Sequence, residues 1–330
     1  MKLKKLKKFL LVFLLTFIII PTHTLAYSDQ VYIGGDNIGI ELRSKGVMII
    51  GTYKVKNSYP AKEAGLKSGD MIVAINNQSI MSINDMVQVI HEHENDESIK
   101  VTYIRGLDKK TTDLKIEKED SICKTGLYVK DSITGIGTLS FIDPNTKKFG
   151  ALGHEIIEKE TGKILEIKDG KIFDTSVTNI VRSEVGSPGE KNAKFYSEQV
   201  NGDVFANTEE GIFGNYTDTI SNRKLYPVAT PDEIQLGKAS MFTVIEGTQV
   251  KEYEIEILKI SDNSEKNKNI LFTITDTELL EKSGGVVAGM SGSPIVQNNK
   301  IIAAVTHVVV DSPTKGYGIF ITNMLEESEK

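Results

Sequence analysis

Cysteine and tryptophan are almost missing from this 330-residue chain, which has one cysteine, Cys123, and no tryptophan. A single cysteine can form neither an intramolecular disulfide nor a multi-cysteine metal site. Basic residues are outnumbered: Lys and Arg total 39 and Asp and Glu 45, for a net charge of -6. Nucleic-acid binding needs a basic face, so this balance argues against a nucleic-acid partner. A hydrophobic content of 39% is too high for a disordered chain, and the length favours two domains.

Long hydrophobic runs are also lacking, except near the N-terminus. Five lysines lie in residues 2–8, and residues 9–20 are apolar apart from Thr16. Small residues then occupy the positions that a signal peptidase reads before a cleavage site after Ala26. This three-part order is typical of a signal peptide. The apolar run of about 12 residues is shorter than the roughly 20 that span a membrane, although an uncleaved anchor stays open. Residues 1–26 are therefore predicted to be an export segment, and the rest of the chain is expected to work outside the cytoplasm.

Residues 31–118 indicate a small α/β domain. From Pro60 onward, the chain follows the pattern Pro-Ala-x-x-Ala-Gly-Leu-x-x-Gly-Asp-x-Ile. Ser82 and Asp85 then form a capping-box signal, and the apolar residues that follow recur at helical spacing. Together these residues resemble the PDZ domains of exported bacterial proteases.

The PDZ resemblance implies a peptide-binding loop at Ile38, Gly39 and Ile40. The backbone N–H groups of such a loop hold a terminal carboxylate, and the ligand adds a β-strand to the domain. A peptide or protein is therefore the expected ligand. Met86 and Ile90, on the apolar helix face, either line the side-chain pocket or fill the core.

Strand signals dominate residues 125–330. Asp169-Gly170, between two strand-like segments, is typical of a hairpin turn. Residues 250–260 and 269–275 indicate a strand pair, and residues 301–310 a buried strand. The expected fold class is mostly β, with the small α/β PDZ domain followed by a β-barrel or sandwich.

One loop has an arrangement suited to nucleophilic catalysis: Gly289-Met290-Ser291-Gly292-Ser293-Pro294-Ile295. Glycines on both sides of Ser291 allow a tight turn that exposes its Oγ. The backbone amides of Gly289 and Ser291 could then form an oxyanion hole. The pattern resembles the nucleophile loop of trypsin-like serine proteases, although Gly-Ser-Gly-Ser is also a common turn composition.

A serine nucleophile needs a base, and the chain has only five histidines. His23 lies in the export segment, and His91 and His93 are typical of a solvated helix end. His154, in a glycine-rich segment after a strand, is the favoured base. His307 ends a buried strand, where it could be structural, line the substrate pocket, or act as the base instead. From the residues alone, the carboxylate partner stays open among Asp143, Asp174, Asp203, Asp218 and Asp276.

Three stretches, residues 137–154, 274–276 and 284–318, resemble the stage IV sporulation protein B peptidases of endospore-forming bacteria. The resemblance covers nearly the whole chain and implies a trypsin-like barrel with the triad His154, Asp276 and Ser291. Asp276 would fix the tautomer of His154 and stabilise its imidazolium form. No cofactor is expected, and no metal-ligand cluster joins this site.

The resemblance also implies a physiology. Such a peptidase is a serine endopeptidase exported into the space between the forespore and mother-cell membranes. There it cleaves a membrane-anchored regulator of an intramembrane protease, and so triggers processing of a mother-cell sigma factor; it also cleaves itself near its N-terminus. Two other functions stay open: a non-catalytic PDZ adaptor, and a general envelope quality-control protease.

Overall fold

The computed structural model describes residues 27–119, 122–159, 162–220, 223–261 and 267–330. Strands make up 56% and helices 11%, which confirms the mostly β prediction. The predicted export segment, residues 1–26, lies outside the described residues. Within the described ranges, no helix is both long and apolar enough to cross a membrane.

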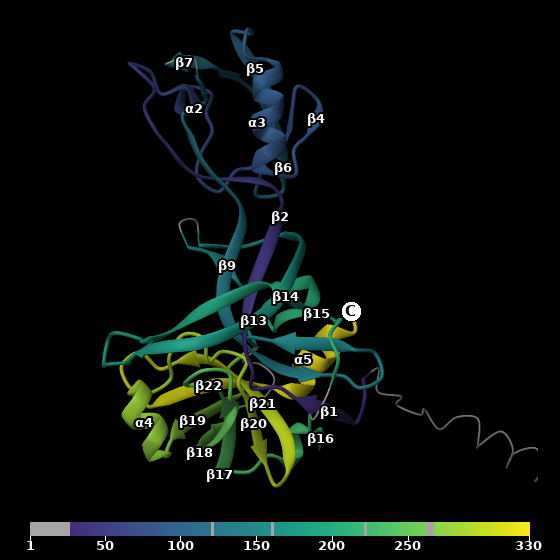
Figure 1. Ribbon diagram of the computed structural model, residues 1–330. Helices are drawn as coiled ribbons and strands as arrows, with labels where there is room; N and C mark the ends of the chain where they lie inside the picture. The colour runs from purple at the N-terminus through teal and green to yellow at the C-terminus, as the bar shows by residue number, and fades with distance from the viewer. Residues whose placement is uncertain (1–26, 120–121, 160–161, 221–222, 262–266) are drawn as a thin grey trace, which may run out of the picture.

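Two long strands join an upper lobe to a lower lobe (Figure 1). They are β2 (Asn37–Thr52) and β9 (Leu127–Ile142), each of 16 residues. They pair antiparallel, from Asn37 opposite Thr138 to Thr52 opposite Leu127. At about 3.3 Å per residue, each strand is long enough to enter both lobes. The upper lobe is thus an insertion between two strands that also build the lower lobe.

The upper lobe contains the PDZ-like signature. Its elements are α2 (Pro60–Glu63), β3 (Met71–Ile75), β4 (Gln78–Ser79), α3 (Ile83–Glu92), β5 (Ser98–Arg105), β6 (Asp108–Lys115), β7 (Glu117–Glu119) and β8 (Ile122–Lys124). The predicted helix cap is confirmed, because the Ser82 Oγ accepts a hydrogen bond from the Asp85 N–H. Met86 and Ile90 are 5% and 8% exposed and pack in the core of this lobe. The signature residue Asp70 is also buried, and both of its carboxylate oxygens accept bonds of 2.7 Å from Arg105.

The first half of the lower lobe is a ring of strands. Beside parts of β2 and β9, it contains β1 (Gln30–Ile33), β10 (Lys148–Ala151), β13 (Ile167–Val181), β14 (Glu190–Thr208), β15 (Gly211–Tyr216) and β16 (Leu225–Pro227). The strands β9, β10, β15, β14, β13 and β2 pair in this order, and the β2–β9 pairing closes the ring. β1 and β16 extend the sheet beyond β9. Ile40, Phe149, Ile172 and Ile212 pack in the core of this half.

The second half of the lower lobe is a closed six-stranded barrel. In barrel order its strands are β17 (Gly237–Thr243), β18 (Lys251–Ile260), β19 (Ile270–Ile274), β22 (Lys315–Phe320), β21 (Lys300–Val308) and β20 (Pro294–Gln297). The predicted strands over 250–260, 269–275 and 301–310 therefore form, as β18, β19 and β21. Two rings of six strands side by side agree with the expected barrel architecture.

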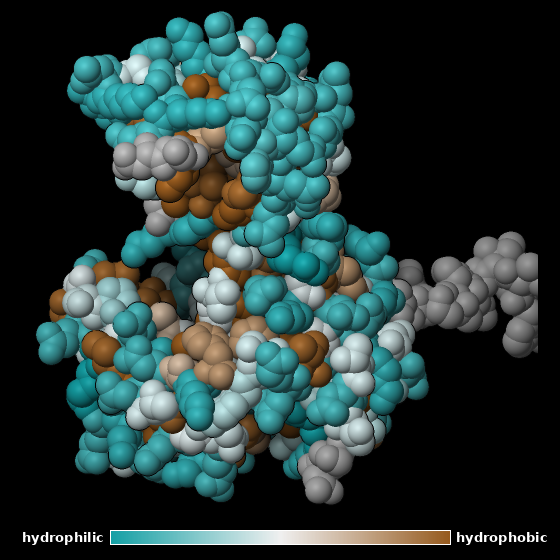
Figure 2. Space-filling view, turned by 45° about the horizontal axis from the view of Figure 1, so that its top comes forward, coloured by the Kyte–Doolittle hydropathy of each residue, from teal (hydrophilic) through white to brown (hydrophobic). Residues whose placement is uncertain are grey.

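The remaining short elements surround this frame. They are the hairpin of β11 (Ile157–Glu158) and β12 (Lys163–Ile164), the 3-10 turn η1 (Pro231–Glu233), and the helices α4 (Thr277–Ser283) and α5 (Ile321–Ser328). A waist separates the two lobes, and hydrophobic surface gathers in the hollow under the upper lobe (Figure 2). A cavity of about 330 Å³ at this junction has residues of both lobes in its walls, among them Met48, Met71 and Ile164.

The hairpin turn predicted at Asp169-Gly170 is wrong. β13 runs straight through these residues, because it is paired on both edges: Gly170 lies opposite Leu42 of β2 and opposite Val204 of β14. Gly170 serves close packing instead. A Cβ at this position would lie 2.6 Å from Leu42 Cδ2 and 2.7 Å from the Glu41 carbonyl oxygen.

The peptide-binding loop predicted at Ile38, Gly39 and Ile40 is also wrong. These residues lie inside β2, in the lower lobe, where Gly39 pairs with Phe173 on one edge and Ile136 on the other. A strand paired on both edges has no free N–H groups for an added peptide strand. Residues 30–44 thus belong structurally to the lower lobe, although the sequence places them beside the PDZ signature.

Candidate active site

The loop that carries Ser291 needs its two flanking glycines. Gly289 and Gly292 both have a φ of 93°, in the left-handed region that side chains other than glycine rarely adopt. A Cβ at Gly292 would lie 2.0 Å from the Thr138 carbonyl oxygen. The glycine pattern recognised in the sequence is therefore a backbone requirement of this turn.

Strand β9 anchors the loop through three hydrogen bonds to its carbonyl oxygens. Thr138 Oγ1 donates to the Gly289 oxygen at 2.7 Å, and the Thr138 N–H donates to the Ser291 oxygen at 2.9 Å. Ser140 Oγ donates to the Gly292 oxygen at 2.7 Å. Neither the Gly289 nor the Ser291 amide has a hydrogen-bond partner within the described part of the chain. A turn held by its carbonyls, with two free N–H groups, is the donor arrangement that an oxyanion hole requires.

Ser291 and His154 line one cavity, which brings the predicted nucleophile and base together. His154 follows β10 of the first ring, and Ser291 precedes β20 of the barrel. The Ser291 Oγ donates to the Thr306 carbonyl oxygen at 2.8 Å. The nucleophile is therefore partly exposed, and its hydroxyl proton points to a backbone oxygen.

His154 is held in one tautomer by its own backbone neighbour. Its Nδ1 lies 2.8 Å from the Glu155 carbonyl oxygen. A carbonyl oxygen can only accept, so Nδ1 carries the proton and Nε2 keeps a lone pair. Burial lowers the pKa of His154 below the usual 6.5, although the Glu155 carbonyl and carboxylate oppose this shift. A neutral imidazole with Nε2 unprotonated is the form that a general base must have.

His307 packs against His154. Their ring centroids are 5.0 Å apart and the rings are tilted by 39°. Burial, with a smaller contribution from His154, lowers the pKa of His307 to about 4, so that it is neutral at physiological pH. Its Nδ1 is buried without a hydrogen-bond partner among the described residues. His307 is thus a neutral ring that packs against His154. It is not among the residues that line the Ser291 cavity.

The structure does not bring Asp276 to His154. Asp276 is the N-cap of α4: its Oδ1 accepts from the Leu279 N–H at 2.9 Å and its Oδ2 from the Glu254 N–H at 3.4 Å. Thr306, whose carbonyl oxygen accepts from Ser291, donates from its Oγ1 to the Asn267 carbonyl oxygen. The start of β19 is therefore the end of this strand that lies near the active site. At about 3.3 Å per residue, Asp276 lies roughly 20 Å further along, beyond the opposite end of β19.

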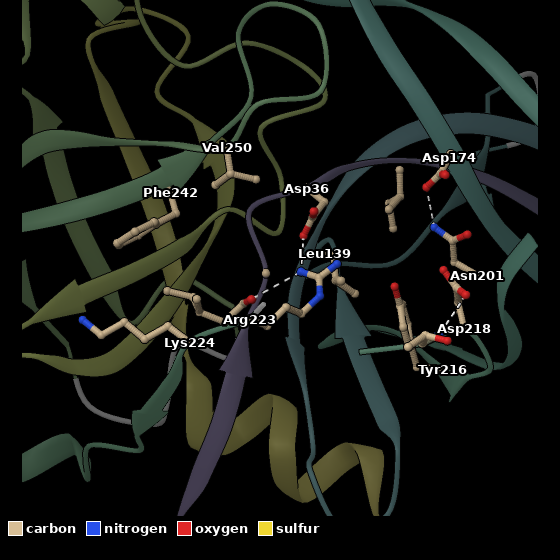
Figure 3. Close-up of a pocket in the computed structure, with 14 residues that line it drawn as sticks. Asp36, Leu139, Asp174, Asn201, Tyr216, Asp218, Arg223, Lys224, Phe242 and Val250 are labelled. Atoms are coloured by element: carbon tan, nitrogen blue, oxygen red, sulfur yellow. Dashed lines mark hydrogen bonds and ion pairs between the residues drawn. The ribbon is translucent and has the colours of Figure 1, made fainter. Parts of the chain in front are cut away.

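The other candidate aspartates also lie elsewhere. Asp143 closes its own turn and accepts from Ser28, while Asp203 lies on the exposed side of β14. Asp174 and Asp218 line a separate cavity of about 500 Å³ between the two rings (Figure 3). In this cavity Asp174 accepts from Asn201, and Arg223 pairs with Asp36. None of these carboxylates shares the cavity of Ser291.

Sequence reasoning missed a buried lysine behind the nucleophile loop. Lys191 is 3% exposed, and its side-chain carbons lie against Gly289. Its Nζ donates to Thr243 Oγ1 at 2.9 Å and to Asn37 Oδ1 at 3.4 Å. Burial lowers the pKa of Lys191 to about 7. Lys191 lies in a polar strand segment where nothing in the sequence distinguishes it from solvated lysines.

Within the described ranges, no group of three His, Cys, Asp or Glu side chains is arranged to hold a metal ion.

Comparisons with known proteins identify two matching families. The family described as SpoIVB peptidase S55 matches residues 121–325, and the PDZ domain family matches residues 36–117. Two curated relatives, both described as serine protease Do-like HtrA, come from Lactococcus lactis subsp. lactis (strain IL1403) and subsp. cremoris (strain MG1363). They are 31% and 30% identical over 90 residues, which are 27% of this chain and 22% of each relative. The chain therefore matches about a fifth of the length of these relatives.

Two solved structures show more remote likeness. The PDZ domain of an SdrC-like protein from Listeria monocytogenes is 23% identical, with a TM-score of 0.23 over 26% of this chain and 87% of that one. Rv3671c from M. tuberculosis H37Rv, in an inactive form, is 13% identical, with a TM-score of 0.30 over 58% and 80%. The family matches confirm the prediction of a PDZ-containing serine peptidase. Since the first family covers more than half of the sequence, the chain belongs to the SpoIVB peptidase S55 family.

Proposed function

We propose that this protein is an active serine endopeptidase with Ser291 as nucleophile and His154 as general base. The observation that carries the proposal is the shared cavity, where Ser291, the unprotonated Nε2 of His154 and two free amides come together. As Ser291 Oγ attacks the substrate carbonyl carbon, His154 takes the hydroxyl proton. The amides of Gly289 and Ser291 stabilise the oxyanion. When the C–N bond breaks, His154 returns the proton to the leaving amine, and water then hydrolyses the acyl-enzyme.

The hydrogen bond from Ser291 to Thr306 belongs to a resting arrangement in this proposal. The Ser291 hydroxyl must turn away from the Thr306 oxygen before His154 can accept its proton. The Glu155 carbonyl oxygen takes over the orienting part of a triad carboxylate, because it fixes the proton on Nδ1 of His154.

The direct test compares two serine variants of the mature chain. Ser291→Ala should abolish both cleavage and labelling by a fluorophosphonate probe, since loss of a triad nucleophile typically costs about 10⁶ in rate. Ser293→Ala is the matched control: Ser293 lies in the same loop, is 0% exposed, and its Oγ has no hydrogen-bond partner among the described residues. Loss of labelling in Ser293→Ala with retention in Ser291→Ala would move the nucleophile. A wild-type chain that is never labelled would favour the non-catalytic adaptor.

The biological role proposed is that of a sporulation signalling protease. The family and the N-terminal export pattern support export into the space between the forespore and mother-cell membranes. There the protease would cleave a membrane-anchored regulator of an intramembrane protease, and itself near the N-terminus. In an endospore-forming host, Ser291→Ala should block sigma-factor processing and leave the chain uncut. A proteome-wide profile with many unrelated targets would favour envelope quality control instead.

The upper lobe is proposed to bind a peptide beside α3. A cavity of about 280 Å³ lies there, lined by Val87 and Ile90 of α3 and by Ile122 and Cys123 of β8. Val87 and Ile122 are exposed hydrophobic side chains, which are suited to hold apolar side chains of a ligand. Val87→Asp should weaken binding of such a peptide, as measured by fluorescence polarisation, while leaving probe labelling of Ser291 unchanged.

A further inference from the structure

The cavity that contains Ser291 and His154 has a strongly apolar wall. It measures about 280 Å³. Its apolar lining consists of Ile40, Ile133, Ile136, Leu152, Ile156, Ile157 and Ala288. This volume lies just below the range of cavities that hold whole drug-sized ligands, so it suits a single side chain. A substrate whose scissile carbonyl reaches Ser291 must place a neighbouring side chain against this wall.

We infer that this cavity is the specificity subsite and that it accepts an aliphatic substrate side chain next to the scissile bond. The inference rests on the proposed function of Ser291. Two residues of the lining, Ile40 and Leu152, are 1% and 4% exposed, so this part of the wall is closed to solvent. A charged side chain entering there would lose its hydration without gaining a partner, whereas an aliphatic one would gain apolar contact.

Glu155 is the one ionisable side chain in the lining besides His154. Its Oε2 is buried and has no hydrogen-bond partner among the described residues. A basic substrate side chain would therefore be the alternative occupant, and Glu155 would attract it. The seven apolar residues around the cavity outweigh this single carboxylate.

The open end of the cavity offers a site for redesign with a matched control. Ile157, on β11, lies at the edge of the cavity and is 49% exposed. Its cross-strand partner on β12, Ile164, is 42% exposed and lines the cavity at the junction of the lobes instead. A charge introduced at either position would lie on the same hairpin and would be similarly exposed to solvent. Only a charge at Ile157 faces the substrate side chain.

The experiment compares cleavage profiles on a peptide library, read by mass spectrometry, for wild type, Ile157→Glu, Ile157→Lys and Ile164→Glu. Wild type should cut at sites enriched in Val, Ile, Leu or Met at one position flanking the scissile bond. Ile157→Glu should lower kcat/KM for aliphatic sites by about tenfold and raise the share of basic sites. Ile157→Lys should favour acidic sites, and Ile164→Glu should keep the wild-type profile.

Each contrary outcome has a distinct meaning. A wild-type preference for Lys or Arg that is lost in Glu155→Gln would overturn the aliphatic subsite and assign the pocket to a basic side chain. Equal changes in Ile157→Glu and Ile164→Glu would show a hairpin effect and overturn the role of Ile157. Probe labelling of Ser291 with no preference at either flanking position would overturn the subsite alone. Absence of both labelling and cleavage would overturn the proposed function, and the subsite with it.

Discussion

Lys191 shows how much a single buried charge can cost this fold. Its ammonium has two neutral oxygens as partners, those of Thr243 and Asn37, and burial lowers its pKa from 10.5 to about 7. Between pH 7 and 10.5 the unfolded chain therefore binds more protons than the folded one. The free energy of unfolding should rise with pH over this window, by up to about 1.4 kcal/mol per pH unit.

The lysine prediction is checked by urea denaturation of wild type and Lys191→Met. The variant should be more stable at pH 7, and its advantage should shrink as the pH approaches 10. A constant difference across this range would mean that Lys191 keeps its ordinary pKa inside the fold.

The pH dependence of catalysis should follow His154. A general base works when neutral, so activity is present above its pKa and is lost as the pH falls through it. Because burial lowers this pKa, the acid limb of kcat/KM should lie below pH 6.5. A limb at or above 6.5, measured with a peptide substrate, would contradict a buried base.

A variant of Asp276 distinguishes a structural role of this residue from a catalytic one. Asparagine caps helices about as well as aspartate, so Asp276→Asn should keep α4 and change kcat/KM by less than about twofold. A triad aspartate replaced by asparagine typically loses about 10⁴ in kcat. A loss of that size in a folded Asp276→Asn variant would show that the carboxylate reaches His154 during catalysis.

At the residue scale, much of the candidate site could be predicted from the sequence. The nucleophile loop was predictable because Gly289 and Gly292 supply backbone conformations that other residues avoid, and that requirement is local. His154 was favoured over His307 because of its glycine-rich setting, and it is His154 that lines the cavity of Ser291. Lys191 and the Glu155 carbonyl were not predictable, because burial and the partner of an imidazole nitrogen depend on strands far apart in the chain.

At the scale of elements, β2 is the part that the local pattern misrepresents. Ile38, Gly39 and Ile40 have the composition of a PDZ loop, but their neighbours are β13 and β9. Asp169-Gly170 failed for the same reason, since pairing on both edges kept β13 extended. Where pairing was between neighbours in sequence, as for β18 and β19, the pattern was sufficient.

The position of β2 predicts an effect of Gly39 on the lower lobe. A Cβ at Gly39 would lie 2.1 Å from Phe173 Cε2, so Gly39→Ala should overpack this core and cost about 1–3 kcal/mol. The control is Gly135→Ala on β9, where a Cβ would meet nothing within 4 Å. Urea denaturation measures both. Equal stability of the two variants would contradict the tight approach of Phe173 to Gly39.

At the scale of the whole molecule, the lower lobe should fold without the upper one. Arg43 of β2 lies opposite Ser132 of β9, so replacing residues 44–131 by Asn-Gly would close a two-residue hairpin at the waist. The barrel core and most of the ring core lie below this point. We expect a folded protein by circular dichroism, with Ser291 still labelled by a fluorophosphonate. A folded but unlabelled product would mean that the upper lobe is needed to assemble the site.

The insertion of one lobe between β2 and β9 also bears on the order in which the chain folds. Without the upper lobe in place, pairing Arg43 with Ser132 closes a loop of almost 90 residues, at an entropic cost of about 3 kcal/mol more than a hairpin. An upper lobe that has already folded holds the two ends of this loop together and removes that cost. Its core is built from residues 47–129, which comprise the upper parts of both strands and the segment between them. Folding of the upper lobe would thus come first. It would hold β2 and β9 together and so promote assembly of the ring that positions His154.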